Sequence, residues 1–190
     1  NAKIGGKIAT NATVENDAIT PTWTELKATN YFDYIIGIRE DITSYAGVDY
    51  LANKDAVVLL EVLDSQKQYI ASNDKSLKTA AEEKYKNISR PFAIYADDHL
   101  VGFTMFAFDF EGSEPEYWLW RFMIDKNFQG KGYGSAALEK IIEYFRGNGA
   151  NHIFLSTKET NTSALKLYHK YRFAETGEMN DGEVVLQLIL

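Results

Sequence analysis

The chain contains no cysteine. This absence excludes a disulfide framework, a thiol nucleophile and a metal site built on thiolates. The three histidines, His99, His152 and His169, lack the spacing of metal ligands, so we expect no metal. The chain also lacks an apolar run approaching the roughly 18 residues of a membrane span, and a basic and apolar leader at its start. We therefore expect a cytoplasmic protein with no membrane partner.

Positive charge is also in short supply. The chain has 20 Lys and Arg residues against 27 Asp and Glu residues, which gives a net charge of −7. Because nucleic acids bind basic surfaces, this balance argues against nucleic acid as the main partner. It does not argue against a phosphate-bearing small molecule, which a local group of backbone N–H donors can hold within an acidic protein.

The length and composition predict one packed domain. Of the 190 residues, 45% are hydrophobic and 14% are aromatic, as is typical of a globule with a sizeable core. Apolar periodicity and turn residues predict antiparallel strands, then a β-α-β unit, then a closing hairpin, which is a mixed α+β arrangement in one sheet. The expected helices cover 54–63, 76–86 and 163–171, with a long helix that stops at 147–149. The expected strands cover 92–96, 100–110, 117–124, 152–157 and 184–190.

Three glycines at alternate positions form the most informative local feature. Gly130, Gly132 and Gly134 lie between an apolar strand and a helix whose apolar residues are spaced i, i+3, i+4, i+7. Unpaired backbone N–H groups and the positive end of the helix dipole make such a junction an anion site. Glycine also lets the main chain approach a pyrophosphate closely and adopt positive φ. The pattern therefore predicts a phosphate cradle.

Other glycine-rich motifs fit this loop less well. A P-loop requires Gly-Lys followed by Ser or Thr, and this chain has no such sequence. The dinucleotide fingerprint G-x-G-x-x-G differs from the G-x-G-x-G found here, and it belongs to a first βαβ unit. A third alternative is a turn that only lets the strand and helix pack, but three glycines carry an entropic cost that such a turn need not incur.

Two segments resemble motifs of the GNAT family of N-acetyltransferases. Residues 129–134, Gln-Gly-Lys-Gly-Tyr-Gly, resemble the acetyl-CoA loop of that family, Q/R-x-x-G-x-G/A. Residues 161–173 resemble the stretch N-x-x-A-x-x-L-Y-x-x-x-G-F, although Arg172 stands where glycine is usual. The resemblance covers about residues 45–190, which we take as the GNAT acetyltransferase domain. It leaves residues 1–44 as an N-terminal extension without a predicted structure.

The resemblance implies both a fold and a co-substrate. The fold would be α+β of the GNAT type, with a mixed, mostly antiparallel central sheet flanked by helices and with strands four and five splayed for the pantetheine arm. The co-substrate would be acetyl-CoA, and the second substrate a small amine. Because similar enzymes are often dimers, a homodimer is also implied. The residues assigned to acetyl-CoA are Phe122, Met123, Ile124, Gln129, Gly130, Lys131, Gly132, Tyr133, Gly134, Ser135, Asn161 and Tyr168.

The same resemblance assigns chemical roles to three positions. A backbone N–H near Met123 would polarise the thioester carbonyl. Tyr168 matches the family tyrosine that protonates the CoA thiolate, although it could instead be a core aromatic residue. A thiol pKa of about 8.5 makes the leaving group only mildly basic, so loss of this acid should slow the enzyme without abolishing activity. Asn161 matches the residue that hydrogen-bonds the pantetheine arm, with helix N-capping as the alternative.

The general base is the least constrained role. A primary amine with a pKa of about 10.4 is neutral in only about one molecule in 2,500 at pH 7, so transfer to it requires a base. Glu114 and Glu116, with Glu111, precede the splayed strand where an acceptor could enter, and we take the first two as the candidate catalytic carboxylates. Glu61 and Glu159 are further candidates. Each alone could be a solvated surface carboxylate, but together they suit a cationic acceptor.

A further resemblance narrows the acceptor. Residues 118–125, Trp-Leu-Trp-Arg-Phe-Met-Ile-Asp, look like the same stretch of bacterial spermine/spermidine (diamine) acetyltransferases, and residues 66–73 are similar in character. A carboxylate-lined site would select such multiply charged amines over neutral ones. The alternatives are another amine acceptor (an amino acid, an aminoglycoside or a protein N-terminus) and a non-catalytic acyl-CoA-binding module, because one fold serves many acceptors.

Overall fold

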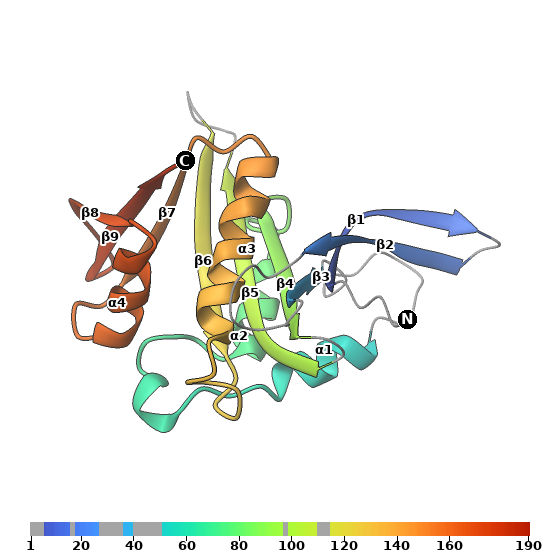
Figure 1. Ribbon diagram of the computed structural model, residues 1–190, viewed down its shortest axis with the longest axis horizontal. Coiled ribbons are helices and arrows are strands. Elements are labelled where there is room, and N and C mark those ends of the chain that lie inside the picture. The colour runs from blue at the N-terminus through green and yellow to red at the C-terminus, as the bar shows by residue number, and fades with distance from the viewer. Residues whose placement is uncertain (1–5, 16–17, 27–35, 40–50, 97–98, 110–114) are drawn as a thin grey trace.

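The computed structural model describes residues 6–15, 18–26, 36–39, 51–96, 99–109 and 115–190 (Figure 1). None of the helices in these ranges combines the length and the apolarity that crossing a bilayer requires. The strands are β1 (Gly6–Glu15), β2 (Ala18–Leu26), β3 (Ile36–Arg39), β4 (Ser89–Ala96), β5 (His99–Asp109), β6 (Glu116–Ile124), β7 (His152–Thr157), β8 (Ala174–Asn180) and β9 (Glu183–Ile189). The helices are α1 (Leu51–Val58), the 3-10 turn η1 (Asp64–Gln66), α2 (Asn73–Ala80), α3 (Tyr133–Gly147) and α4 (Thr162–Lys170).

Seven strands form one mixed sheet, and β1 and β2 form a separate pair. The order in the large sheet is β3-β4-β5-β6-β7-β9-β8, and β6 with β7 is its parallel pair, while the others are antiparallel. This arrangement confirms the predicted mixed, mostly antiparallel sheet. β3 pairs with β4, so the first 44 residues contribute a strand to it. The domain boundary after residue 44 stays a prediction.

Helices cover both faces of the large sheet. Figure 1 shows α3 in front of β5 and β6, with α2 behind the sheet. α3 buries Leu138 and Phe145 against the sheet, and the rings of Phe145 and Phe106 lie 4.6 Å apart. On the opposite face, a second apolar cluster joins α1 and α2 to the strands through Val57, Leu77, Ala80, Phe103 and Met105.

Two expected helices are shorter than the sequence pattern predicts. The helix expected over 54–63 ends at Val58, and the one expected over 76–86 is α2, which ends at Ala80. The first difference has a tertiary cause. The backbone N–H of Glu61 donates to Asp125 Oδ2 at 2.9 Å, and its carbonyl accepts from Lys126 N at 2.7 Å, so the backbone of Glu61 is bonded to the end of β6.

The two parallel strands part after a single pairing. β6 and β7 pair at Trp118 and Phe154 and diverge beyond this point (Figure 1). A β-bulge adds to the distortion, because Met105 and Phe106 of β5 face Arg121 and Leu119 of β6, which leaves Trp120 as the extra residue. Since β6 and β7 are the fourth and fifth strands of the large sheet in chain order, this is the predicted splay.

Candidate active site

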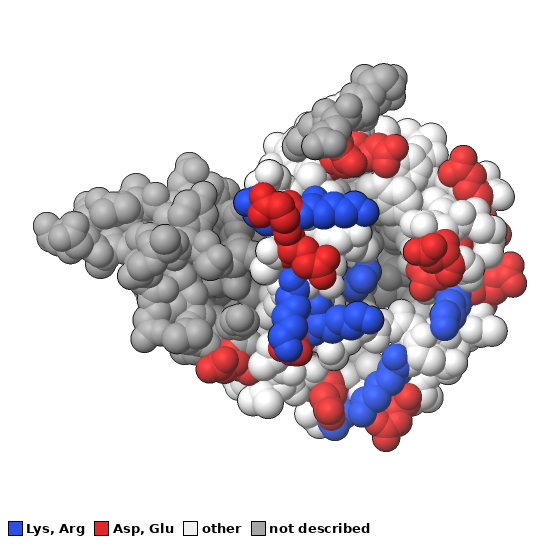
Figure 2. All heavy atoms as spheres, turned by 180° about the vertical axis from the view of Figure 1, so that it is seen from behind, with Lys and Arg blue, Asp and Glu red and all other residues white. Residues whose placement is uncertain are grey.

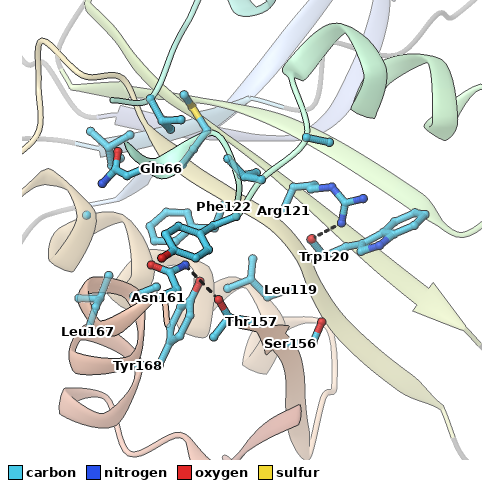
Figure 3. Close-up of a pocket in the computed structure, with 18 of the residues that line it drawn as sticks. Gln66, Leu119, Trp120, Arg121, Phe122, Ser156, Thr157, Asn161, Leu167 and Tyr168 are labelled. Carbon is cyan, nitrogen blue, oxygen red and sulfur yellow. Dashed lines mark hydrogen bonds between the residues drawn. The ribbon is translucent and has the colours of Figure 1, made fainter. Parts of the chain in front are cut away.

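A cavity of about 910 Å³ occupies the space between the diverging strands (Figure 3). Residues 118–124 of β6 form one wall, and Ser156 and Thr157 of β7 form the other. The glycine loop, which we define as residues 129–135, lines one end, together with residues of α4. A second group of lining residues, which we call the far end, consists of Tyr85, Trp118, Trp120, Arg121, Ser156 and Glu183. Figure 3 shows Trp120 and Arg121 away from Gln66, which bonds to Gln129 of the glycine loop.

The glycine loop has the geometry of an anion site. Gly130 and Gly132 adopt positive φ, 73° and 90°, and Gly132 is the N-cap residue of α3. The first helical hydrogen bond runs from Ala136 N to Gly132 O at 3.1 Å. The N–H groups of residues 133–135 lie in the first turn of α3, where no helical carbonyl precedes them to accept a hydrogen bond. Their direction and the helix dipole favour an anion at this end of the helix. The loop can bind a phosphate with backbone atoms alone.

The cavity is lined by all the residues predicted to contact acetyl-CoA except Lys131 and Tyr133. Lys131 Nζ donates to Asn127 O at 2.8 Å and lies 5.5 Å from the ring centroid of Phe128. The Tyr133 ring also contacts Phe128, with centroids 6.0 Å apart. In this structure both side chains therefore support the loop from within rather than line the cavity.

Gln129 lines the cavity, and its side chain holds the glycine loop in place through hydrogen bonds. Its Nε2 donates to Ile124 O and to Gln66 Oε1, both at 2.9 Å. Gln66 in turn accepts the backbone N–H of Leu63 at 3.1 Å. The side chain of Gln129 thus fastens the glycine loop to the end of β6 and to η1.

Asn161 occupies the N-cap position of α4 without capping it. Its side chain makes no capping hydrogen bond, so the N-capping alternative is wrong. The side-chain Nδ2 instead donates to Thr157 Oγ1 at 3.0 Å (Figure 3). Since its nitrogen is used in this way, the amide oxygen is the atom that Asn161 can offer to the N–H of a ligand.

Tyr168 is both a core residue and a cavity residue. It is 8% exposed, and its ring lies 5.8 Å from that of Phe173 in the core beneath α4. Burial raises the pKa of Tyr168 well above its ordinary value, and the negative charge of Glu183 raises it further. The hydroxyl is therefore a neutral hydrogen-bond donor at physiological pH.

Comparison with known proteins identifies this arrangement. Residues 57–173 match the family model described as the acetyltransferase (GNAT) family. The chain belongs to the GNAT family. It is an acetyl-CoA-dependent N-acetyltransferase, as the resemblance of residues 129–134 and 161–173 to that family implied.

Individual relatives agree with this assignment. The chain is 34% identical, over 140 residues, to a spermine/spermidine N(1)-acetyltransferase of Bacillus subtilis (strain 168), covering 70% of this chain and 90% of the relative. Its fold is similar to that of a domain from Methanocaldococcus jannaschii, at 14% identity and a TM-score of 0.61, covering 83% of this chain and 100% of that one. It is also similar to PaiA N-acetyltransferase from Thermoplasma acidophilum in complex with coenzyme A, at 17% identity and a TM-score of 0.54, covering 82% and 99%.

The candidate carboxylates of this GNAT enzyme fall in different places. Glu111 and Glu114 lie outside the described residues. Glu116 is described, but it is absent from the lining of the cavity, and its carboxylate accepts from Trp118 Nε1 at 2.8 Å. Glu61 is paired with Lys126 at 2.6 Å, and this hydrogen bond holds the pKa of Glu61 below its usual value. Glu159 is exposed and does not line the cavity either.

The far end contains a carboxylate that the sequence did not single out. Glu183, the first residue of β9, lines the cavity and accepts a hydrogen bond from Ser156 Oγ at 2.7 Å. The sequence offered only a weak indication of this role: Glu183 follows the Asp-Gly turn and is the acidic first residue of a strand that is otherwise mostly apolar. Only the pairing of β9 with β7 brings Glu183 beside the splayed strands.

Arg121 is the cation of the far end. Its Nη1 donates to Trp120 O at 2.7 Å, and the guanidinium lies 5.0 Å from the ring centroid of Trp120. Burial lowers the pKa of Arg121, and the charge of Glu183 partly opposes that effect. Its buried Nε has no hydrogen-bond partner within the described part of the chain.

Proposed function

We propose that the enzyme transfers the acetyl group of acetyl-CoA to a primary amine of a polyamine such as spermidine or spermine. The observation that carries the proposal is that one cavity joins a glycine-rich loop at the N-terminus of α3 to a far end bearing the carboxylate of Glu183. The first feature suits a phosphorylated donor and the second a cationic acceptor. The name of the Bacillus subtilis relative supports the same substrate class.

Acetyl-CoA would occupy the cavity along β6. The N–H groups of the glycine loop suit its pyrophosphate. The edge of β6 at residues 122–124 that faces away from β5 suits the pantetheine amides, because β7 does not pair with it. The oxygen of Asn161 would accept from a pantetheine N–H. Phosphate binding here is not assigned to Lys131, which does not line the cavity and whose ammonium group donates to Asn127 O.

The residues present can perform acyl transfer. A backbone N–H near Met123 would stabilise negative charge on the thioester oxygen. Tyr168 would donate a hydrogen bond to the departing sulfur. Because the pKa of Tyr168 is raised while that of a free thiol is about 8.5, full proton transfer is uphill unless the bound thiolate becomes more basic. We therefore assign Tyr168 the role of assisting departure, with a modest contribution to the rate.

The far end offers a polyamine aromatic rings in addition to the carboxylate of Glu183. The rings of Tyr85 and Trp120 lie 5.1 Å apart and both line the cavity, so their faces can contact ammonium groups or methylene segments. Acidic and basic side chains are interspersed on the surface seen from the α2 side (Figure 2). We therefore assign the recognition of a cationic acceptor to residues that line the cavity rather than to a broad acidic surface.

A second acceptor class is favoured by Arg121. Arg121 lines the cavity, and a guanidinium is well suited to a carboxylate. An acceptor that carries both an amine and a carboxylate, such as an amino acid, could place one group on Glu183 and the other on Arg121. This candidate is an N-acetyltransferase as well, and it differs from the first only in the acceptor.

One experiment separates these proposals. Release of CoA from acetyl-CoA would be measured with spermidine, spermine, a panel of amino acids, neutral amines and no acceptor. Release stimulated by polyamines supports the first proposal, and release stimulated by amino acids replaces it with the second. Tight acetyl-CoA binding without stimulation by any amine would contradict both and favour an acyl-CoA-binding module.

A further inference from the structure

The backbone of Glu183 is held by the adjoining turn and by strand pairing. The two turn residues, Asp181 and Gly182, both adopt positive φ, 48° and 79°, as a type I′ hairpin requires. Val184, which follows Glu183 in β9, pairs with Thr157 of β7 and with Met179 of β8. Glu183 therefore extends from a strand held on both sides.

Its carboxylate is also fixed on the cavity side. Ser156 Oγ donates to Glu183 Oε2 at 2.7 Å, which leaves the other oxygen and further lone pairs for a ligand. Of the described residues that line the cavity, Asp181 and Glu183 bear the carboxylates, and Asp181 is exposed while Glu183 is half-buried. The half-buried group is the one whose charge solvent screens less.

The charged and titratable groups facing Glu183 come from three elements. Arg121 approaches from β6 and Tyr168 from α4, and both interact electrostatically with its charge, while Asp181 lies in the adjoining turn. Glu183 therefore lines the same cavity as Tyr168, the residue proposed to assist thiolate departure, and as the bulged strand β6. An acceptor nitrogen must approach from within this same region.

We infer that Glu183, oriented by Ser156, binds the acceptor ammonium group and removes its proton, an inference that rests on the proposed function. The carboxylate takes one proton from R–NH3+, which leaves R–NH2. The amine nitrogen forms a bond to the thioester carbon and the C–S bond breaks. The second proton of the nitrogen is passed to the thiolate by way of Tyr168, and Glu183 releases its proton to solvent. The products are the acetamide, CoA thiol and one proton.

The test is Glu183→Gln, with Glu178→Gln as the matched control. Glu178 belongs to the same hairpin, is exposed, and does not line the cavity. For Glu183→Gln we expect kcat/KM for the best amine to fall at least about 30-fold, in the range of a lost general base. The KM for acetyl-CoA should stay within about twofold, and the acidic limb of the kcat/KM–pH profile should disappear. Glu183→Asp should restore part of the activity, and Glu178→Gln should behave as wild type.

Several outcomes would overturn the inference. Activity of Glu183→Gln within about threefold of wild type, or an unchanged acidic limb, would exclude Glu183 as the base. If Glu183→Gln fails to fold, Ser156→Ala keeps the carboxylate and removes its fixed orientation, and kcat/KM for the amine should then fall about three- to tenfold. No loss in that variant would count against the inference. Wild-type enzyme that acetylates no amine would overturn the proposed function, and this inference with it, whereas an active wild type with an active Glu183→Gln overturns this inference alone.

Discussion

The two ends of the cavity are built from different parts of the chain. The glycine loop uses backbone atoms from one continuous segment, and its donors are oriented by positive φ at Gly130 and Gly132 and by the start of α3. The far end uses side chains, and Arg121 and Glu183 come from strands distant in sequence. A backbone site depends on local conformation, whereas a side-chain site depends on which strands the fold brings together.

The largest effect is expected from a change that disturbs the wall shared by both ends. A Cβ added to Gly102 of β5 would lie 2.4 Å from Met123 O, on the strand that forms this wall. Because the close atom belongs to the backbone, Gly102→Ala should destabilise the fold by about 3 kcal/mol, as overpacking does. Urea unfolding would measure this. Gly147→Ala is the control, since no atom lies within 4 Å of its added Cβ, and an equal loss there would contradict the argument.

A smaller change should affect the glycine loop alone. Gly132 has φ of 90°, so Gly132→Ala imposes about 1–2 kcal/mol of backbone strain that the loop can relieve only by moving its N–H groups. We expect the KM for acetyl-CoA to rise about 5- to 30-fold while the KM for the amine is unchanged. Gly177→Ala has a similar φ of 86° in β8 and should leave both constants unaltered. An equal rise in both constants for Gly132→Ala would show that the two ends are not separable.

Tyr168→Phe should affect turnover rather than binding. The variant keeps the ring that packs on Phe173 and loses only the hydroxyl. Because the leaving thiol has a pKa of about 8.5, we expect kcat to fall roughly tenfold, at or below the low end of general acid effects. Steady-state kinetics would test this, and an acyl donor with a more acidic thiol should narrow the gap between wild type and variant. A gap that does not narrow would contradict assistance to the leaving group.

The smallest effect concerns a departure from the family pattern. Arg172 adopts φ of 67°, so the left-handed turn is kept although glycine is absent. Arg172→Gly should relieve about 1–2 kcal/mol of strain and lose part of it to the greater freedom of the unfolded chain, for a net gain of about 0.5 kcal/mol. Arg172→Ala is the control, since it removes the side chain but keeps the Cβ. Equal stabilisation of both variants in thermal unfolding would assign the effect to the side chain instead.

The sequence predicted features that depend on local pattern. β7 occupies 152–157 as expected, and the closing hairpin turns at the expected Asp-Gly pair. The glycine loop was recognisable for the same reason, because glycines between a strand and a helix permit the positive φ that is found at Gly130 and Gly132. Local chemistry fixes these elements, and tertiary contacts only retain them.

Features that depend on distant contacts were not predictable in this way. The apolar run after Val58 fits a helix, but Asp125 and Lys126 bind the backbone of Glu61 and end it. The sequence did not identify Glu183 as a cavity residue, because its place in the cavity results from strand order rather than from its neighbours in sequence. Glu116 is the first residue of the splayed strand β6, yet it does not line the cavity, and its carboxylate accepts a hydrogen bond from Trp118 Nε1.

The bond between Gln66 and Gln129 limits how this enzyme can be redesigned. Residues 66–71 line the cavity and are a natural segment to exchange when a new acceptor is wanted. Yet Gln66 Oε1 accepts a hydrogen bond from Gln129 Nε2, so this segment also supports the glycine loop. Just before the segment, the backbone of Glu61 is bonded to residues 125 and 126, which lead into the loop. A graft that changes the acceptor while keeping the donor must therefore retain these two anchor points and vary only the residues after Gln66.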